Sequence, residues 1–285
     1  MDYRIIHHLR LPKMLTAILA GAALSVSGLT MQTLFRNPLA GPYILGVSSG
    51  ASLGVALVTM LGSMAWGAAL GNVAVSIAAI CGSAVVLLIM LALSKRVHSN
   101  VSLLIIGMML GAIAGALVNV LQNYSNPDAL KLFIVWTLGS LSNVGWQQLS
   151  VLACILCVGF GLLVLLVKPL NGLLLGDDYA RALGVNVPRV RLGIVLTTGL
   201  LAGGVTAFCG PIAFVGVAVP HIARGLCRTT NHRITVPVAA LVGADLLLLC
   251  DILCSLSTYP LPISTMSSLF GAPIIIWILI KKKDI

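Results

Sequence analysis

The stretch GDDYARALGVN, residues 176–186, gathers three ionisable side chains that could form charged contacts. On a helix, Asp177, Asp178 and Arg181 would share one face, with Asp177 and Arg181 as a favourable acid-first pair. Two glycines would bound the turn, Gly176 and Gly184. A short amphipathic helix of this kind suits contact with a soluble protein, and a solvated connector is the alternative interpretation.

Two carboxylates, Asp245 and Asp251, lie in the apolar run GADLLLLCDILCSL. A charge at membrane depth is costly and normally faces protein or a water-filled path. On a helix their spacing places them about 120 degrees apart, so they are not a tight pair. They are either satisfied by packing or line a path, and as proton or cation sites they would indicate an ion-coupled secondary transporter.

Other kinds of chemistry find little support in the sequence. A glycine-rich loop ending in Gly-Lys-Ser/Thr is absent, so any ATP-driven role needs a partner protein. The five histidines lack metal-ligand spacing, and the seven cysteines fall in or beside apolar runs, which disfavours a disulfide framework. We expect no enzymatic activity, cofactor or metal, and no nucleic-acid binding, because no basic patch with interleaved aromatics is present.

The elements that position these groups are apolar, because the chain is 59% hydrophobic and only 8% charged. Such a chain is an integral membrane protein, and we expect an all-α polytopic fold in a single transmembrane domain, residues 1–285. The segment 129–141 is too short to cross and is predicted to be interfacial or re-entrant. The nine predicted spans are 14–35, 43–61, 68–93, 101–122, 147–167, 191–208, 212–226, 236–257 and 263–280.

Alternating the ends of these spans separates the cations between two sides. One side holds Arg36, Lys95, Arg96, Lys168, Arg181, Arg189, Arg191, Arg224, Arg228, Arg233, Lys281, Lys282 and Lys283. The loops of the other side hold only Lys131. The first side is therefore predicted to be cytoplasmic, together with the C-terminus. An odd number of spans leaves the N-terminus outside, which conflicts with the charge rule for Arg4, Arg10 and Lys13.

Small residues are dense in every span, which is typical of closely packed membrane helices. A short internal echo is also present. LAGA at residues 19–22 is followed by Gly41-Pro42 and Gly46-Val47, and LAGG at residues 201–204 is followed by Gly210-Pro211 and Gly216-Val217. This order indicates an internal repeat, as in repeat-built transporters.

Four stretches together resemble one known family across almost the whole chain. In order they are LRLPKMLTAILAGAALSVSGLTMQTLFRNPLAGPYILGVSSGASLG, GDDYARALGVN, GPIAFVGVAVPHIAR and PISTMSSLFGAPIIIWIL. The chain resembles the permease subunit of ATP-binding-cassette importers for iron-siderophore, haem or cobalamin complexes. The resemblance implies a bacterial inner-membrane protein, a second permease subunit (identical or different), cytoplasmic ATPase subunits, an extracytoplasmic substrate-binding protein and contact with membrane lipid.

The same resemblance assigns roles to individual residues. Residues 171–190 resemble the family's cytoplasmic coupling loop, whose short helices dock into a cleft of the ATPase. RNPLAGP resembles the inner gate, which makes Asn37 and Leu39 gate residues, with Asn100 a further candidate. Arg10 and Lys13 resemble basic residues that meet the binding protein outside, which would explain their exception to the charge rule.

The chain also departs from the family pattern. The family usually has about ten spans, one more before the LRLPK segment. Gly41 and Pro260 stand where acidic residues are usual, and Ser255 stands where a basic one is expected. The last replacement weakens the expectation for binding-protein docking.

Overall fold

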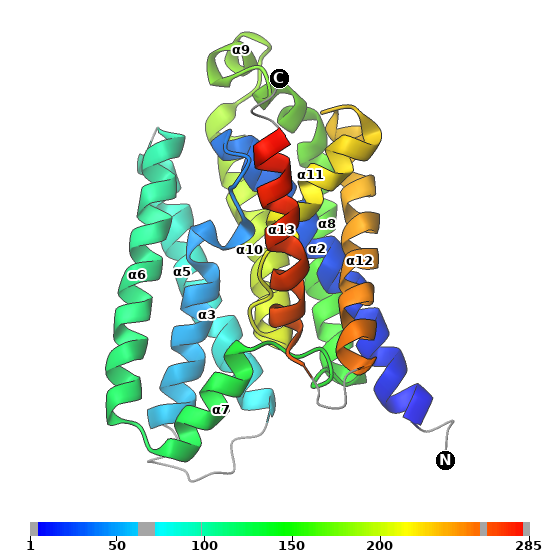
Figure 1. Cartoon of the computed structure of the whole chain (residues 1–285). Coiled ribbons are helices and arrows are strands. Elements are labelled where there is room, and N and C mark those ends of the chain that lie inside the picture. Colours follow the sequence, from blue (N-terminus) through cyan, green and yellow to red (C-terminus); the bar gives the residue numbers. More distant parts are fainter. Residues whose placement is uncertain (1–4, 62–71, 98, 257–260, 282–285) are drawn as a thin grey trace.

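The computed structural model describes residues 5–61, 72–97, 99–256 and 261–281, and these contain helices and no strand. Nearly all of the helices run between two ends of one bundle (Figure 1). We call these the α9 end and the α7 end, after the short helices that lie there. The elements are η1 Ile6–Arg10, α2 Leu11–Phe35, η2 Pro42–Leu45, α3 Val47–Ala56, η3 Leu57–Leu61, α5 Asn72–Arg96, α6 Asn100–Tyr124, α7 Pro127–Thr137, α8 Trp146–Leu173, α9 Asp177–Ala182, α10 Val187–Cys209, α11 Val215–Cys227, α12 His232–Leu256 and α13 Ile263–Lys281.

The expected all-α polytopic fold is confirmed, and the described part of each predicted span is mainly helical. Residues 68–71 and 257 of the predicted spans lie outside the described residues. Six of the described helices are long and apolar enough to cross a membrane: 6–35, 73–96, 100–124, 146–173, 187–209 and 232–256. The apolar helices at 47–61, 215–227 and 263–276 are shorter. α11 has 13 residues and so reaches about 20 Å, less than the bilayer core. The count of nine spans is therefore approximate.

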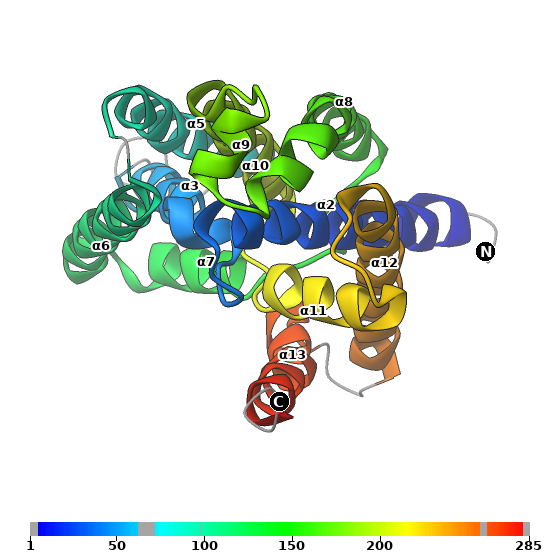
Figure 2. The same ribbon diagram turned by 90° about the horizontal axis from the view of Figure 1, so that it is seen from above.

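The helix α2 forms the centre of the bundle. Viewed from above, α8 and α10 lie on one side of it and α11 and α12 on the other (Figure 2). From Ala23 to Phe35 every residue of α2 is buried, which explains why this helix lacks an amphipathic pattern. Its small residues allow the backbones to approach: Gly28 lies against the backbone of Gly216 on α11, and Gly21 against that of Gly243 on α12.

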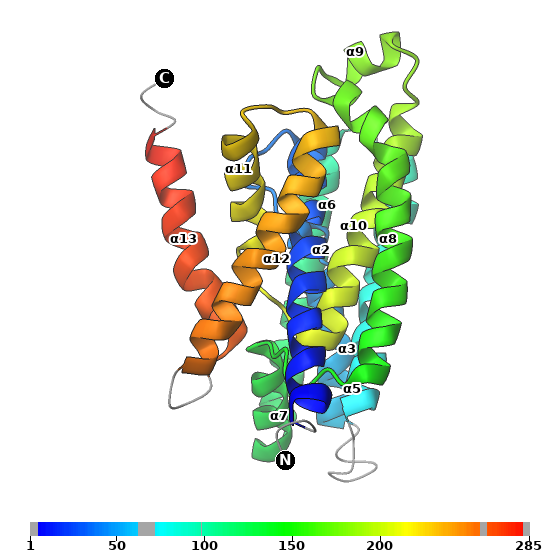
Figure 3. The same cartoon turned by 90° about the vertical axis from the view of Figure 1, so that its right-hand side faces the viewer.

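Two segments cross the bundle as a turn or extended stretch followed by a short helix. After Gly41, η2 and α3 lead toward the α7 end, whereas the stretch that begins at Gly210 leads into α11 toward the α9 end (Figures 1 and 3). The two short helices therefore run in opposite directions after matching Gly-Pro pairs. This arrangement agrees with the internal repeat, in its inverted form.

The segment predicted not to cross is α7, which has 11 residues and would reach about 16 Å. Its first turn is capped by Asn126, whose Oδ1 accepts a hydrogen bond from the Ala129 amide over 2.8 Å. α7 lies at the end of the bundle opposite α9 (Figure 3). The expectation that residues 129–141 are too short to span is confirmed.

Candidate coupling and gate site

The helix α9 stands at one end of the bundle and is set by two glycines. Gly176 has a φ of 116° and Gly184 a φ of 83°, conformations that side chains rarely adopt. A Cβ on Gly176 would lie 2.6 Å from Nη2 of Arg36, so the glycine also makes room for that guanidinium. The structure therefore places Gly176 and Gly184 on either side of α9, as the sequence predicts.

Asp177 on α9 points into the bundle and joins three other elements. Its carboxylate oxygens lie 3.6 Å from Nη2 of Arg191 and 4.0 Å from Nη2 of Arg36. The Asn100 side-chain amide donates to Oδ2 of Asp177 over 3.5 Å. The Arg191 side chain is only 4% exposed and that of Asp177 26%, so water screens this contact less than it would a surface pair.

The partners of Asp177 are themselves fixed to neighbouring backbone. Asn100 Nδ2 also donates to the Leu34 carbonyl at the end of α2 over 2.9 Å. Arg191 Nη1 donates to the Val97 carbonyl between α5 and α6 over 2.9 Å. One carboxylate on α9 therefore connects the ends of α2, α6 and α10. We call Arg36, Asn100, Asp177 and Arg191 the Asp177 cluster.

The opposite face of α9 is exposed. Arg181 Nη1 pairs with Oδ1 of Asp178 over 3.2 Å, and the Asp178 side chain is 99% exposed. The prediction that Asp177 pairs with Arg181 is wrong, because the Asp177 side chain faces Arg36 at the end of α2 and Arg191 on α10. Tyr179 and Leu183 are also exposed, which places large apolar groups beside an exposed charge pair. A face of this kind suits a protein contact better than bulk water.

The RNPLAGP segment follows α2 as a tight turn held by its own residues and by α11. The Asn37 side chain accepts a hydrogen bond from the Leu39 amide over 2.9 Å, which is an Asx turn. Leu39 is exposed. Nε2 of His221 donates to the Pro38 carbonyl over 2.8 Å. The gate candidates Asn37 and Leu39 thus adjoin each other, and α11 contacts their turn.

A second polar network lies beside this turn. Arg224 Nη1 donates to Gln32 Oε1 over 2.8 Å, and Gln32 Nε2 donates to the Val217 carbonyl over 3.1 Å. His232 Nε2 lies 2.9 Å from Thr33 Oγ1, and its Nδ1 lies 2.8 Å from Asn171 Oδ1. This network is not predicted from the sequence. Its only sign there is the presence of these polar side chains within or beside apolar runs.

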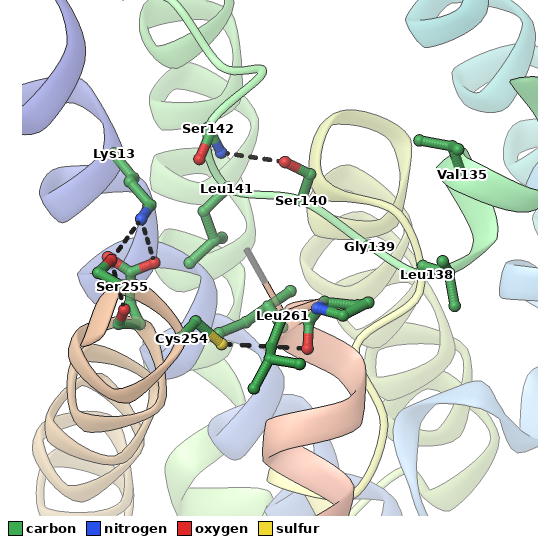
Figure 4. Close-up of a pocket in the computed structure, with 13 residues that line it drawn as sticks. Lys13, Val135, Leu138, Gly139, Ser140, Leu141, Ser142, Cys254, Ser255 and Leu261 are labelled. Atoms are coloured by element: carbon green, nitrogen blue, oxygen red, sulfur yellow. Dashed lines mark hydrogen bonds and ion pairs between the residues drawn. The ribbon is translucent and has the colours of Figure 1, made fainter. Parts of the chain in front are cut away.

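At the α7 end, Lys13 and Asp251 form an ion pair across α2 and α12. Lys13 Nζ lies 2.8 Å from Asp251 Oδ1 and 3.1 Å from Ser255 Oγ, and the two charged side chains are 24% and 16% exposed. Lys13 and Ser255 face each other in Figure 4. They border a cavity of about 350 Å³ between α2, α12, α13 and the loop after α7. Arg10, one turn before, is exposed.

The two aspartates of α12 do not come together. Asp245 is exposed on the helix face that carries Leu241 and Leu249, and it has no side-chain partner among the described residues. Asp251 is neutralised by Lys13. No group of three or more histidine, cysteine or acidic side chains that could hold a metal occurs in the described ranges. The geometry therefore gives the ion-coupled alternative no paired carboxylate site.

A bundle with six helices long and apolar enough to cross a membrane, two shorter apolar helices that follow Gly-Pro pairs and a small charged helix at one end defines a polytopic membrane protein. Residues 1–281 match the FecCD transport family. The chain is 38% identical, over 284 residues, to the vitamin B12 import system permease protein BtuC of Escherichia coli O9:H4 (strain HS), covering 96% of this chain and 83% of that protein. The protein of the same name from Shigella boydii serotype 18 gives the same identity and coverage. The chain belongs to the FecCD transport family.

Solved structures agree with this assignment. An inward-facing conformation of a metal-chelate type ABC transporter superposes with a TM-score of 0.90 at 32% identity, covering 98% of this chain and 88% of that one. PsaBC from Streptococcus pneumoniae in complex with Fab shares the fold at a TM-score of 0.60 and 17% identity, covering 96% and 92%.

Proposed function

We propose that this chain is the permease subunit of an ATP-driven importer of metal chelates, of the kind formed by vitamin B12, iron-siderophore or haem complexes. The observation that carries the proposal is α9, whose outer face is exposed and whose inner face is tied by Asp177 to three helices of the bundle. The likeness to vitamin B12 permeases and to a metal-chelate type transporter supports the cargo class. The chain has no P-loop, so the ATPase is a separate protein.

In this proposal α9 transmits ATP-driven motion to the membrane. Residues 171–190 form the coupling loop of a single transmembrane domain, and the face with Asp178, Tyr179 and Arg181 docks on the ATPase. A movement of α9 displaces Asp177, and with it the ends of α2, α6 and α10. Since α2 leads directly into the turn of Asn37 and Leu39, this motion opens or closes the path at that end, which is alternating access.

Orientation and partners follow from charge. Among the described residues most cations lie at the α9 end, which favours a cytoplasmic α9 end and C-terminus in a bacterial inner membrane. A second permease subunit, of the same or a different sequence, would complete the path. At the outer end, Arg10 is free of intramolecular ion pairs in the described structure and suits an acidic site on a binding protein, whereas Lys13 is occupied by Asp251.

The assembly itself tests this proposal. Tagging the chain, extracting it gently from native membranes and weighing the intact particle should give two permease and two P-loop ATPase subunits. Uptake that collapses with the ion gradient and ignores ATP would instead support an ion-coupled transporter, with Asp245 as the residue to change next.

Replacing Asp178 and Arg181 together with alanine should weaken the association with the ATPase by about tenfold, because an exposed contact surface loses its charge pair. The fold should keep its thermal stability, since an exposed pair on a short helix contributes little. Co-purification and light scattering measure the two quantities. The matched control is Arg233→Ala, an exposed cation at the start of α12 that lies outside residues 171–190. ATPase binding as strong as wild type would count against docking through this face.

Charge reversal at Arg10 and at Lys13, the two basic residues of the outer end, should have different effects. Arg10→Glu should lower affinity for the binding protein, most at low salt, where exposed charges are least screened. Lys13→Glu should instead lower the free energy of unfolding by about 1–3 kcal/mol, because it places a second carboxylate beside Asp251 in a partly buried site. Surface plasmon resonance and thermal unfolding in detergent measure the two effects. Equal loss of binding in both, with stability intact, would contradict this division.

A further inference from the structure

A polar cleft opens between α3, α6 and α7, in a part of the bundle that no candidate residue occupies. Its volume is about 400 Å³. Its lining combines apolar residues, among them Val118, Phe133 and Pro211, with six polar residues: Ser48, Ser49, Ser52, Asn119, Gln122 and Thr137. α3 contacts both α6 and α7, and α7 lies at the α7 end of the bundle (Figure 1).

The sequence brings these polar groups onto facing helix surfaces. Ser48 and Ser52 stand four apart on α3, and on α6 Gly115 precedes Asn119 by four positions. Residues three or four apart share a helix face, so each set projects into the same space. A Cβ on Gly115 would meet nothing within 4 Å, so this face of α6 is open to the cleft.

The three serines of the cleft differ from several hydroxyls of the long helices. Thr16, Ser25, Thr33 and Thr206 each donate to the carbonyl four residues earlier, which satisfies them within their own helix. In the cleft, the side chains of the three serines, Asn119 and Gln122 have no hydrogen-bond partner among the described residues. Polar side chains without a protein partner need another polar group to bind, so this surface suits a polar ligand or water in a path.

The lining also limits what kind of ligand fits. It combines hydroxyls and amides, which both donate and accept hydrogen bonds, with apolar side chains. It contains no lysine, arginine, histidine or acidic residue. A ligand face with carboxylates would lose its hydration there without gaining a cation, which is unfavourable, whereas a neutral face with amides or hydroxyls would be satisfied.

We propose that this cleft, which includes Ser52, Asn119 and Gln122, is a cargo-binding station in the transport path. It selects a chelate by an uncharged edge that carries amide or hydroxyl groups. The inference rests on the proposed importer function and adds to it the surface that discriminates the cargo. At about 400 Å³, the cleft holds one edge of a bulky chelate and leaves the remainder in the wider path.

The test is ATP-driven uptake by the complete importer complex in proteoliposomes, with three radiolabelled probes. Cyanocobalamin and ferrichrome present neutral amide or hydroxamate surfaces, whereas haem presents two carboxylates. We expect uptake of at least one neutral probe to exceed that of haem by at least about tenfold, the difference that unfavourable burial of a charge produces. Preferred uptake of haem would overturn the proposal.

Two variants locate the effect in the cleft. Gly115→Phe fills the open space and should lower uptake of the preferred probe at least about tenfold. Gly161→Phe is the matched control, because a Cβ on Gly161 of α8 also meets nothing within 4 Å but lies outside the cleft. Asn119→Leu with Gln122→Leu should raise KM about tenfold through lost hydrogen bonds, with Asn123→Leu as its control.

The outcomes separate this proposal from the broader one. ATP-driven uptake that ignores both cleft variants would overturn the role of the cleft and leave the importer function intact. Absence of ATP-driven uptake for all three probes would overturn the importer function, and the cleft proposal with it. Loss of uptake in Gly161→Phe to the same degree as in Gly115→Phe would also overturn the role of the cleft.

Discussion

Replacing Asp177 with asparagine should uncouple ATP hydrolysis from transport. The asparagine keeps the shape of the side chain and a carbonyl oxygen for Asn100, but it leaves the guanidinium of Arg191, 4% exposed, without its carboxylate. Removing one partner of a buried ion pair costs up to about 3–5 kcal/mol. If about 1.4 kcal/mol of this is lost from the contact that links α9 to α10, uptake should fall about tenfold. Hydrolysis by the associated ATPase should continue, because the exposed face of α9 is unchanged.

The measurement pairs ATPase rate with uptake rate in the same proteoliposomes. The control is Asp178→Asn, which removes a carboxylate of the same helix that is 99% exposed and pairs only with Arg181 among the described residues. That variant should alter ATPase affinity rather than the number of substrates moved per ATP. If Asp177→Asn transported at the wild-type ratio of uptake to hydrolysis, the Asp177 cluster could not be the connection between α9 and the bundle.

A double variant tests whether the charge pair carries the effect. Asp177→Asn combined with Arg191→Gln removes both charges and should be less damaging to folding than Asp177→Asn alone, since no buried guanidinium is left without a carboxylate. Arg36 also loses its partner, but its side chain is 52% exposed to water. Coupling should not return, because the link between α9 and α10 is still missing. Thermal unfolding and the uptake ratio separate these two consequences.

The coupling segment illustrates how far the sequence alone could lead. Its position, its two glycines and its helical spacing were predictable, because turn chemistry and residue spacing are local properties. The pairing of Asp177 was not, since it depends on which side of α9 faces the bundle. Arg191 lies on the next helix, and its selection over Arg181 is a matter of tertiary packing.

The outer ion pair shows the same limit at longer range. Lys13 and Asp251 were assigned separate roles because they lie almost at opposite ends of the chain. Only the crossing of α2 and α12 brings their charges to 2.8 Å. Helix positions, by contrast, followed from hydrophobic runs, and the short helices α3 and α11 were signalled by the Gly-Pro pairs before them. That α3 and α11 are too short to span a membrane could not be predicted from the sequence, because an apolar run can have either extended or helical backbone.

Among the glycines that the structure describes, Gly28 is the one at which replacement by alanine should destabilise the fold most. A Cβ at this position would overlap the carbonyl and Cα of Gly216, and these are backbone atoms that cannot rotate away. Overpacking of this kind costs about 1–3 kcal/mol where side chains can yield, and more where two backbones must separate. We expect little folded protein in the membrane, measured as the monodisperse fraction after extraction in mild detergent.

The control for Gly28 is Gly161→Ala, at a helical glycine whose Cβ would meet nothing within 4 Å. Alanine is favoured over glycine within helices by about 1 kcal/mol, so this control should be neutral or stabilising, and Gly28→Ala should lose stability despite the same gain. A folded Gly28→Ala protein would require α11 to move away from α2. That movement would pull His221 from the Pro38 carbonyl, 2.8 Å away, and disturb the turn of Asn37 and Leu39. If Gly28→Ala kept wild-type stability and wild-type uptake, neither folding nor transport would depend on the close α2–α11 contact.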